Sequence, residues 1–132
     1  MPSVFNAIDT SEGWQIRNAP ILGMAPLIAA MDIYNKAGMS SIREKGENMS
    51  SYMEYLIFHF IPSIKIITPD KRGCQLSLLV PNGKKVFKFI LDKGVVCDWR
   101  EPDIIRIAPH PLYNTYVEIF EFIKVLKKAV DS

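Results

Sequence analysis

The chain has 132 residues, of which 48% are hydrophobic and 23% charged, so it is long enough for one ordinary core and too short for two. Its formal net charge of +2 is too small to indicate a nucleic-acid or membrane-surface partner. Cys74 and Cys97 lack metal-ligand spacing, which is typical of reduced, packed thiols in a cytoplasmic protein, and no structural metal is expected. No apolar stretch reaches the length of a membrane span.

The first predicted helix lies between Pro20 and Ala37, where apolar residues occur nearly all round. This pattern favours a helix that packs between other elements rather than one on a surface. Gly38 is expected to end it. Because proline is acceptable in a first turn but breaks a helix interior, Pro26 predicts that the regular helix begins near Ala25.

A second, long amphipathic helix is predicted next and ends before Pro62. Ser41 and Glu44 have the spacing of a capping box at its start. Apolar and small residues follow at steps of three and four, and the expected core face comprises Ile42, Gly46, Met49, Met53, Leu56 and Phe60.

After Pro62 the sequence pattern changes to strands. Residues 64–68 (IKIIT) and 74–80 (CQLSLLV) alternate and predict a hairpin around the turn PDKRG. A short helix is predicted from Lys84, with Gly94 as its C-cap. Residues 95–99 (VVCDW) and 104–108 (IIRIA) then predict two more strands around the polar turn REPD.

The last predicted helix begins at Thr115, which forms a capping-box pattern with Glu118. Its expected apolar face is Tyr116, Ile119, Phe120, Ile123, Leu126 and Val130. The order of elements is helix, helix, strand, strand, helix, strand, strand, helix. This order predicts an α+β fold with helices packed on one face of a mainly antiparallel sheet.

Arg106 stands in the middle of the apolar run IIRIAPHPLYN. Burying an unpaired charge there would lower the stability of the fold by an amount on the order of several kcal/mol. It therefore needs an anionic partner. Two interpretations follow: a carboxylate of the same chain (Glu12, Asp98 or Glu101), or the carboxylate of a ligand. The residues alone favour the first, as in a free-standing ligand-binding or regulatory module.

No complete active site is apparent in the sequence, which lacks a phosphate-binding loop, a nucleophile elbow and a paired-histidine motif. His59 lies beside phenylalanines and is expected to be a partly exposed or core residue. His110, between two prolines, is expected to tether its loop rather than act as an acid or base.

Four blocks taken together resemble the C-terminal part of kynureninases: GWQIRNAPILGMAPLIAAMDIYNKAGM, IREKGENMSSYMEYLI, ITPDKRGCQLSL and GVVCDWREPDIIRIAPHPLYNT. The resemblance covers Glu12 to Leu126. It implies the small C-terminal domain of a pyridoxal-phosphate enzyme with the aspartate aminotransferase fold. Residues 1–132 are then a single domain, with residues 1–18 as a connecting segment that carries a substrate-site loop and residues 19–132 as the small domain.

By that resemblance, Arg106 binds the α-carboxylate of L-kynurenine or 3-hydroxykynurenine, and Asn18 lies near the aromatic end of the substrate. Trp14 forms an apolar wall there, with core packing as the alternative. Arg17 stands where relatives often carry serine, which leaves the preference for a ring hydroxyl open.

The resemblance also implies a cytoplasmic homodimer, acting in tryptophan catabolism and NAD biosynthesis, whose large N-terminal domain holds pyridoxal phosphate. None of the eleven lysines lies in a motif typical of the Schiff-base lysine, and no catalytic or cofactor-binding residue is assigned to this chain. The sequence therefore predicts an inactive piece of a longer hydrolase, which cleaves a carbon-carbon bond to give anthranilate or 3-hydroxyanthranilate plus L-alanine.

Overall fold

The computed structural model describes residues 4–15, 17–18 and 20–132. The chain forms two compact units, Met1–Gly38 and Met39–Ser132, and each is described by itself. In the described part of the chain, no helix is long and apolar enough to cross a membrane.

The first unit contains a short 3-10 helix, η1 (Ser11–Trp14), and the helix α1 (Ile21–Ala37). The predicted start near Ala25 is wrong, because α1 begins four residues earlier and holds Pro26 inside. A proline there removes one backbone donor, and the carbonyl left without it can be hydrated in so exposed a helix. Gly38 ends α1 as predicted, at a positive φ of 77° that favours glycine.

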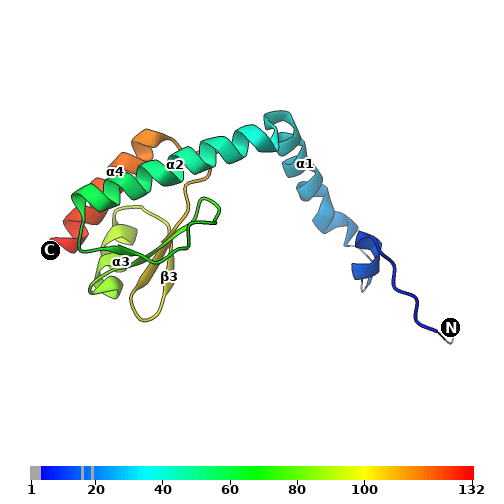
Figure 1. Ribbon diagram of the computed structural model, residues 1–132, viewed down its shortest axis with the longest axis horizontal. Helices are drawn as coiled ribbons and strands as arrows, with labels where there is room; N and C mark the ends of the chain where they lie inside the picture. The colour runs from blue at the N-terminus through cyan, green and yellow to red at the C-terminus, as the bar shows by residue number, and fades with distance from the viewer. Residues whose placement is uncertain (1–3, 16, 19) are drawn as a thin grey trace. The chain divides into compact units, whose positions relative to one another are not determined.

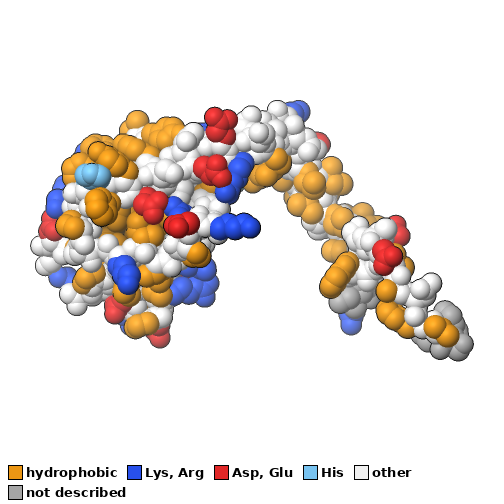
Figure 2. Space-filling view, viewed as in Figure 1, with side chains coloured by type: hydrophobic (Ala, Val, Ile, Leu, Met, Phe, Trp, Pro, Cys, Tyr) orange, Lys and Arg blue, Asp and Glu red, His pale blue; other side chains and the backbone are white. Residues whose placement is uncertain are grey.

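No residue of α1 is buried, although the sequence predicts a helix packed between other elements. Figure 2 shows apolar side chains exposed along this helix. Leu22 is 91% exposed and Ile21 81% exposed. The apolar character that predicts burial is present, but the described residues of the first unit supply no surface to cover it.

The second unit opens with α2 (Met39–Phe60). The predicted capping box is wrong, because the helix begins at Met39 and Ser41 lies inside it. The predicted core face is otherwise confirmed: Ile42, Gly46, Met49, Met53 and Leu56 are buried, whereas Phe60, in the last turn, is 47% exposed.

Four short strands form one antiparallel sheet, as the sequence predicts, and their order in the sheet is β1-β2-β4-β3. They are β1 (Lys65–Ile66), β2 (Leu76–Leu79), β3 (Asp98–Arg100) and β4 (Ile104–Ile107). Both predicted hairpins are confirmed, β1 with β2 and β3 with β4, and β2 and β4 are the central pair.

Helices α3 (Gly83–Asp92) and α4 (Tyr116–Val130) complete the unit. The capping box between Thr115 and Glu118 is present in full, and Gly94 follows α3 at a φ of 82°. In α4 the buried residues are Ile119, Ile123, Leu126 and Ala129, whereas the predicted core residues Tyr116 and Phe120 are partly exposed.

The hydrophobic core lies between the three helices and one face of the sheet. Figure 1 shows α2 and α4 side by side, with α3 next to the sheet. Leu76, Leu78, Ile105 and Ile107 alternate along the two central strands and all belong to this core. The α+β class with helices on one face is therefore confirmed, and the intervening residues of β2 and β4 belong to the other face of the sheet.

Candidate carboxylate-binding site

The face of the sheet away from the helices carries a row of polar side chains. Ser77 on β2 pairs with Arg106 on β4, and Arg106 in turn pairs with Asp98 on β3. Residues directly opposite one another on antiparallel strands project to the same face. All three are partly buried, so the row is open to solvent without being fully hydrated.

The guanidinium of Arg106 binds the carboxylate of Asp98. Its Nε donates to Asp98 Oδ2 at 2.6 Å, and its Nη2 contacts the same oxygen. Arg100 Nε donates to this oxygen as well, at 3.1 Å. The pairing within the chain that the residues alone favour is therefore observed, and the partner of Arg106 is Asp98. The reason is the register of the β3–β4 hairpin, which places Asp98 opposite Arg106.

The charges around Asp98 keep its carboxylate ionised at neutral pH. Desolvation acts to raise the pKa of Asp98, but the hydrogen bond from Arg106 and the positive charges of Arg100 and Arg106 lower it. The net result is a pKa below the ordinary value for aspartate. The ion pair with Arg106 is therefore present throughout the neutral range.

Asp98 occupies one edge of the Arg106 guanidinium and leaves another available. The contacts involve Nε and Nη2, and within the described residues Nη1 donates no hydrogen bond. The side chain is 34% exposed, so the outer edge is reachable from solvent. A planar guanidinium can bind a second carboxylate through two parallel N–H donors at that edge.

The loop after β4 is tied to α2 and to itself. Lys45 Nζ donates to the carbonyl oxygens of Pro111 at 2.5 Å and Asn114 at 3.3 Å. The His110 N–H donates to Asn114 Oδ1 at 2.8 Å, and His110 Nδ1 accepts from the Leu112 N–H at 3.3 Å. His110 thus has the loop-tethering role that the sequence predicts, and the loop leading away from Arg106 is held in place.

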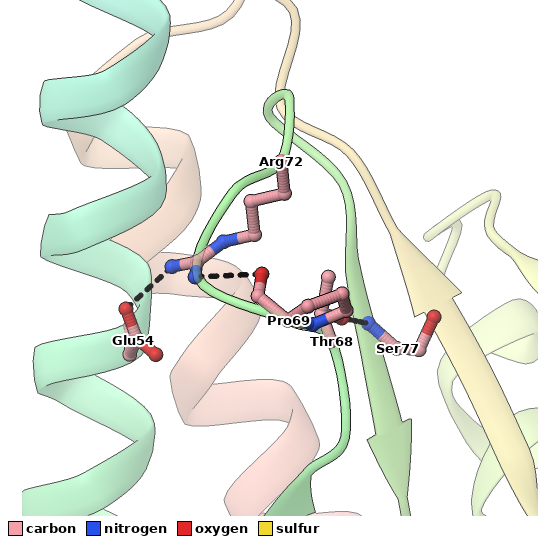
Figure 3. A network of polar contacts seen from close by, with 5 residues as sticks. All are labelled: Glu54, Thr68, Pro69, Arg72 and Ser77. Carbon is pink, nitrogen blue, oxygen red and sulfur yellow. Dashed lines mark hydrogen bonds and ion pairs between the residues drawn. The ribbon is translucent and has the colours of Figure 1, made fainter.

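Next to Ser77, which lies opposite Arg106 on β2, a polar network fixes the turn between β1 and β2. Arg72 donates to Glu54 Oε2 at 2.6 Å and to the Pro69 carbonyl at 3.4 Å, and Thr68 Oγ1 accepts from the Ser77 N–H at 2.6 Å (Figure 3). Arg72 is well buried, with 15% of its side chain exposed. Sequence reasoning missed this pair, because no pattern links Glu54 to Arg72 across 18 residues.

A cavity of about 430 Å³ lies elsewhere in the second unit, between the segment after α3, the end of β4 and helix α4. Arg106 is not among its lining residues, which include Lys93, Cys97, Glu118 and Glu121. Burial, and secondarily the charge of Asp98, raise the pKa of the Cys97 thiol to about 11. This thiol is therefore protonated at neutral pH and a poor nucleophile.

The remaining predicted site residues belong to the first unit. Trp14 ends η1 and is 87% exposed, and Arg17 and Asn18 are exposed as well. Core packing, the alternative for Trp14, does not occur among the described residues. The grouping of these three residues with Arg106 stays a prediction. Among the carboxylates of the second unit considered as partners for Arg106, Asp98 binds it, whereas Glu101 forms no ion pair with it in the described structure. Glu12 belongs to the first unit, and its pairing with Arg106 stays a prediction.

The described side chains do not form a site that fits pyridoxal phosphate. The partly buried lysine, Lys45, directs its ammonium at two loop carbonyls. The cavity beside α4 carries the carboxylates of Glu118 and Glu121, which repel a phosphate.

Comparison with known proteins gives one consistent family. Residues 42–126 match the family model described as the kynureninase C-terminal domain. The chain is 38% identical to a kynureninase of Christiangramia forsetii, with all of the chain and 33% of the relative covered. It is 42% identical to a kynureninase of Xanthomonas campestris and 43% identical to one of Xanthomonas oryzae, with 86% of the chain and 29% of each relative covered. The chain thus spans about a third of the length of the curated relatives it matches.

Proposed function

This chain belongs to the kynureninase C-terminal domain family, and we propose that it supplies the carboxylate-binding part of a kynureninase substrate site. In this proposal the outer edge of Arg106 binds the α-carboxylate of L-kynurenine or 3-hydroxykynurenine. The observation that carries it is a guanidinium held on a rigid strand, one-third exposed, with Nη1 unused by the described residues.

The physical role of such a group is orientation. A bidentate pair with Arg106 fixes both the position and the plane of the ligand carboxylate, so the rest of the amino acid is held at a defined angle. A strand holds the guanidinium more rigidly than a loop. Lysine offers a point charge without the planar pair of donors and is a poor substitute.

The proposal assigns the aromatic end of the substrate to three residues of the first unit. Asn18 hydrogen-bonds the ketone or ring substituents, Trp14 packs against the aromatic ring, and Arg17 lies close to the ring substituents. Pyridoxal phosphate, bound by other residues of a full-length kynureninase, would supply the electron sink for cleavage of the side-chain carbon-carbon bond. The products are anthranilate or 3-hydroxyanthranilate and L-alanine, and the full-length enzyme is a cytoplasmic homodimer.

On this proposal the isolated chain is inactive, and the experiment uses the full-length protein. Arg106→Ala is expected to lower kcat/KM for L-kynurenine about a hundredfold, the loss of ~3 kcal/mol of charge-assisted hydrogen bonding. The absorbance of bound cofactor should not change. Arg43→Ala is the matched control, because Arg43 forms an arginine–carboxylate pair with Glu47 on α2.

A second candidate function, a free-standing ligand-binding or regulatory module, is favoured by the Arg106–Asp98 ion pair itself. In that case Arg106 is structural. Arg106→Ala would then lower the thermal midpoint of the chain. An unchanged kcat/KM for L-kynurenine in a folded full-length Arg106→Ala protein would refute the proposed role in substrate binding.

A further inference from the structure

The carboxylate of Asp98 contacts two guanidinium groups, those of Arg100 and Arg106, on the open face of the sheet. Its Oδ2 accepts hydrogen bonds from Nε of Arg106 at 2.6 Å and from Nε of Arg100 at 3.1 Å, and it contacts Arg106 Nη2. These three residues come from both strands of one hairpin, in the observed register. Their relative positions are therefore set by the backbone.

The charge of this group is unbalanced by one. Two guanidinium groups carry +2, and a single carboxylate carries −1, so +1 remains. One ligand carboxylate neutralises that remainder. The internal ion pair is therefore compatible with a role in ligand binding, because it removes only one of the two positive charges.

The contact to Asp98 also fixes which edge of Arg106 faces outward. Both donors that point at Asp98 lie on the Nε side of the guanidinium. The plane and tilt of the head group are thereby set before a ligand arrives, and the remaining paired donors, on Nη1 and Nη2, project from the adjacent terminal edge. Without this contact, a partly exposed arginine samples several rotamers, which must be frozen upon binding.

We propose that Asp98 is a positioning residue, which orients the guanidinium of Arg106 so that its outer edge presents two donors to the ligand carboxylate. This inference rests on the proposed function of Arg106. In it, Arg106 binds the ligand carboxylate and Asp98 orients the guanidinium of Arg106. Arg100 keeps the net charge of the group positive.

The test uses full-length enzyme carrying Asp98→Asn or Asp98→Glu, with Glu47→Gln as the control. Asparagine keeps the size but removes the charge, so the cluster becomes +2 and loses its strong acceptor. KM for L-kynurenine is expected to rise about tenfold with a smaller change in kcat, while inhibition by sulfate strengthens several-fold at fixed ionic strength. A merely structural aspartate would not produce weaker substrate binding together with stronger binding of a non-directional anion.

Asp98→Glu keeps the charge and displaces the head group, so KM is expected to rise without stronger sulfate inhibition. Glu47→Gln removes a carboxylate from an exposed arginine pair on α2 and should change neither quantity. An unchanged KM in a folded Asp98→Asn enzyme overturns the inference; if that variant does not fold, an unchanged KM in Asp98→Glu overturns it.

The outcome for Arg106 separates the two levels of the argument. If Arg106→Ala lowers kcat/KM and both Asp98 variants behave as wild type, Arg106 binds the substrate without help from Asp98, and only this inference fails. If Arg106→Ala itself leaves kcat/KM unchanged, the proposed function fails.

Discussion

Gly83, the first residue of α3, packs so closely against the β3–β4 turn that a single methyl group should be destabilising. A Cβ at this position would lie 3.0 Å from Asp103 Cα, 3.0 Å from Trp99 Cζ3 and 3.1 Å from the Asp103 carbonyl carbon. Non-bonded carbons prefer about 3.5–4.0 Å, so the neighbouring atoms must move away by a few tenths of an ångström. Two of the three atoms are backbone, and the Gly83 N–H also donates to Asp103 Oδ1 at 3.0 Å. The turn cannot move away without weakening that bond.

The expected cost of Gly83→Ala follows from two opposing effects. Overpacking of this kind costs about 1–3 kcal/mol. The better helix propensity of alanine returns at most about 1 kcal/mol. We therefore expect the free energy of unfolding of the 132-residue chain to fall by about 1–2 kcal/mol, measured from the midpoint of urea unfolding with an unchanged slope.

Gly73→Ala is the matched control, because a Cβ there has nothing within 4 Å. Its free energy of unfolding should change by no more than about 0.5 kcal/mol. A Gly83→Ala chain that is as stable as wild type, or more stable, would refute the packing argument. Trp99 fluorescence provides a local readout, because Cζ3 of its ring is one of the three atoms that a Cβ at Gly83 would approach. The ring should therefore move with the turn.

Two further predictions concern titratable groups. Burial raises the pKa of the Cys97 thiol from 9.0 to about 11, so its thiolate fraction at pH 8 is about a hundredfold lower than in the unfolded chain. Alkylation of Cys97 by iodoacetamide should therefore be much slower in the native chain than in the urea-unfolded chain, and equal rates would contradict this. Hydrogen bonds from the backbone N–H and the hydroxyl of Thr115 lower the pKa of Glu118, so their stabilisation is present above the ordinary glutamate pKa of 4.5 and is lost as pH falls through the lowered value. Thr115→Ala should cost about 1 kcal/mol at pH 7, and Glu118→Gln should reduce the loss of stability between pH 5 and pH 3, both measured by urea unfolding.

The fold of the second unit could be predicted because its local signals agree with its packing. Alternation in LSLL and IIRI, the capping box at Thr115 and the Gly94 stop all specify the elements that form. The errors occur where a local signal competes with the rest of the chain. Ser41 and Glu44 have capping-box spacing, but the helix extends past them to Met39, since the residues before Ser41 can also be helical.

The candidate site was only partly predictable, for a physical reason. The apolar run around Arg106 shows that the guanidinium needs an anion, and Asp98 was one of three candidates within the chain. Choosing among them requires the hairpin register, because a shift of one residue would place Asp98 on the opposite face. The sequence also posed internal pairing and ligand binding as alternatives. The structure shows the internal pairing with Asp98, and ligand binding through the donors that Asp98 leaves unused stays a proposal.

The exposed helix α1 leads to a last prediction about the surface that covers it. A helix of 17 residues without a single buried residue gains no packing energy from its own unit, and an isolated helix of this length is marginal in water. Its apolar residues are those expected of a helix that is covered on several sides. In the 132-residue chain, the amides of α1 should exchange with solvent nearly as fast as in an unstructured peptide, whereas the core-facing turns of α2 stay protected. In the full-length protein the same amides should become protected, measured by hydrogen–deuterium exchange of both forms. Equal protection of α1 and α2 in the 132-residue chain would mean that the helix is stable without a covering surface, and the reasoning from burial would fail.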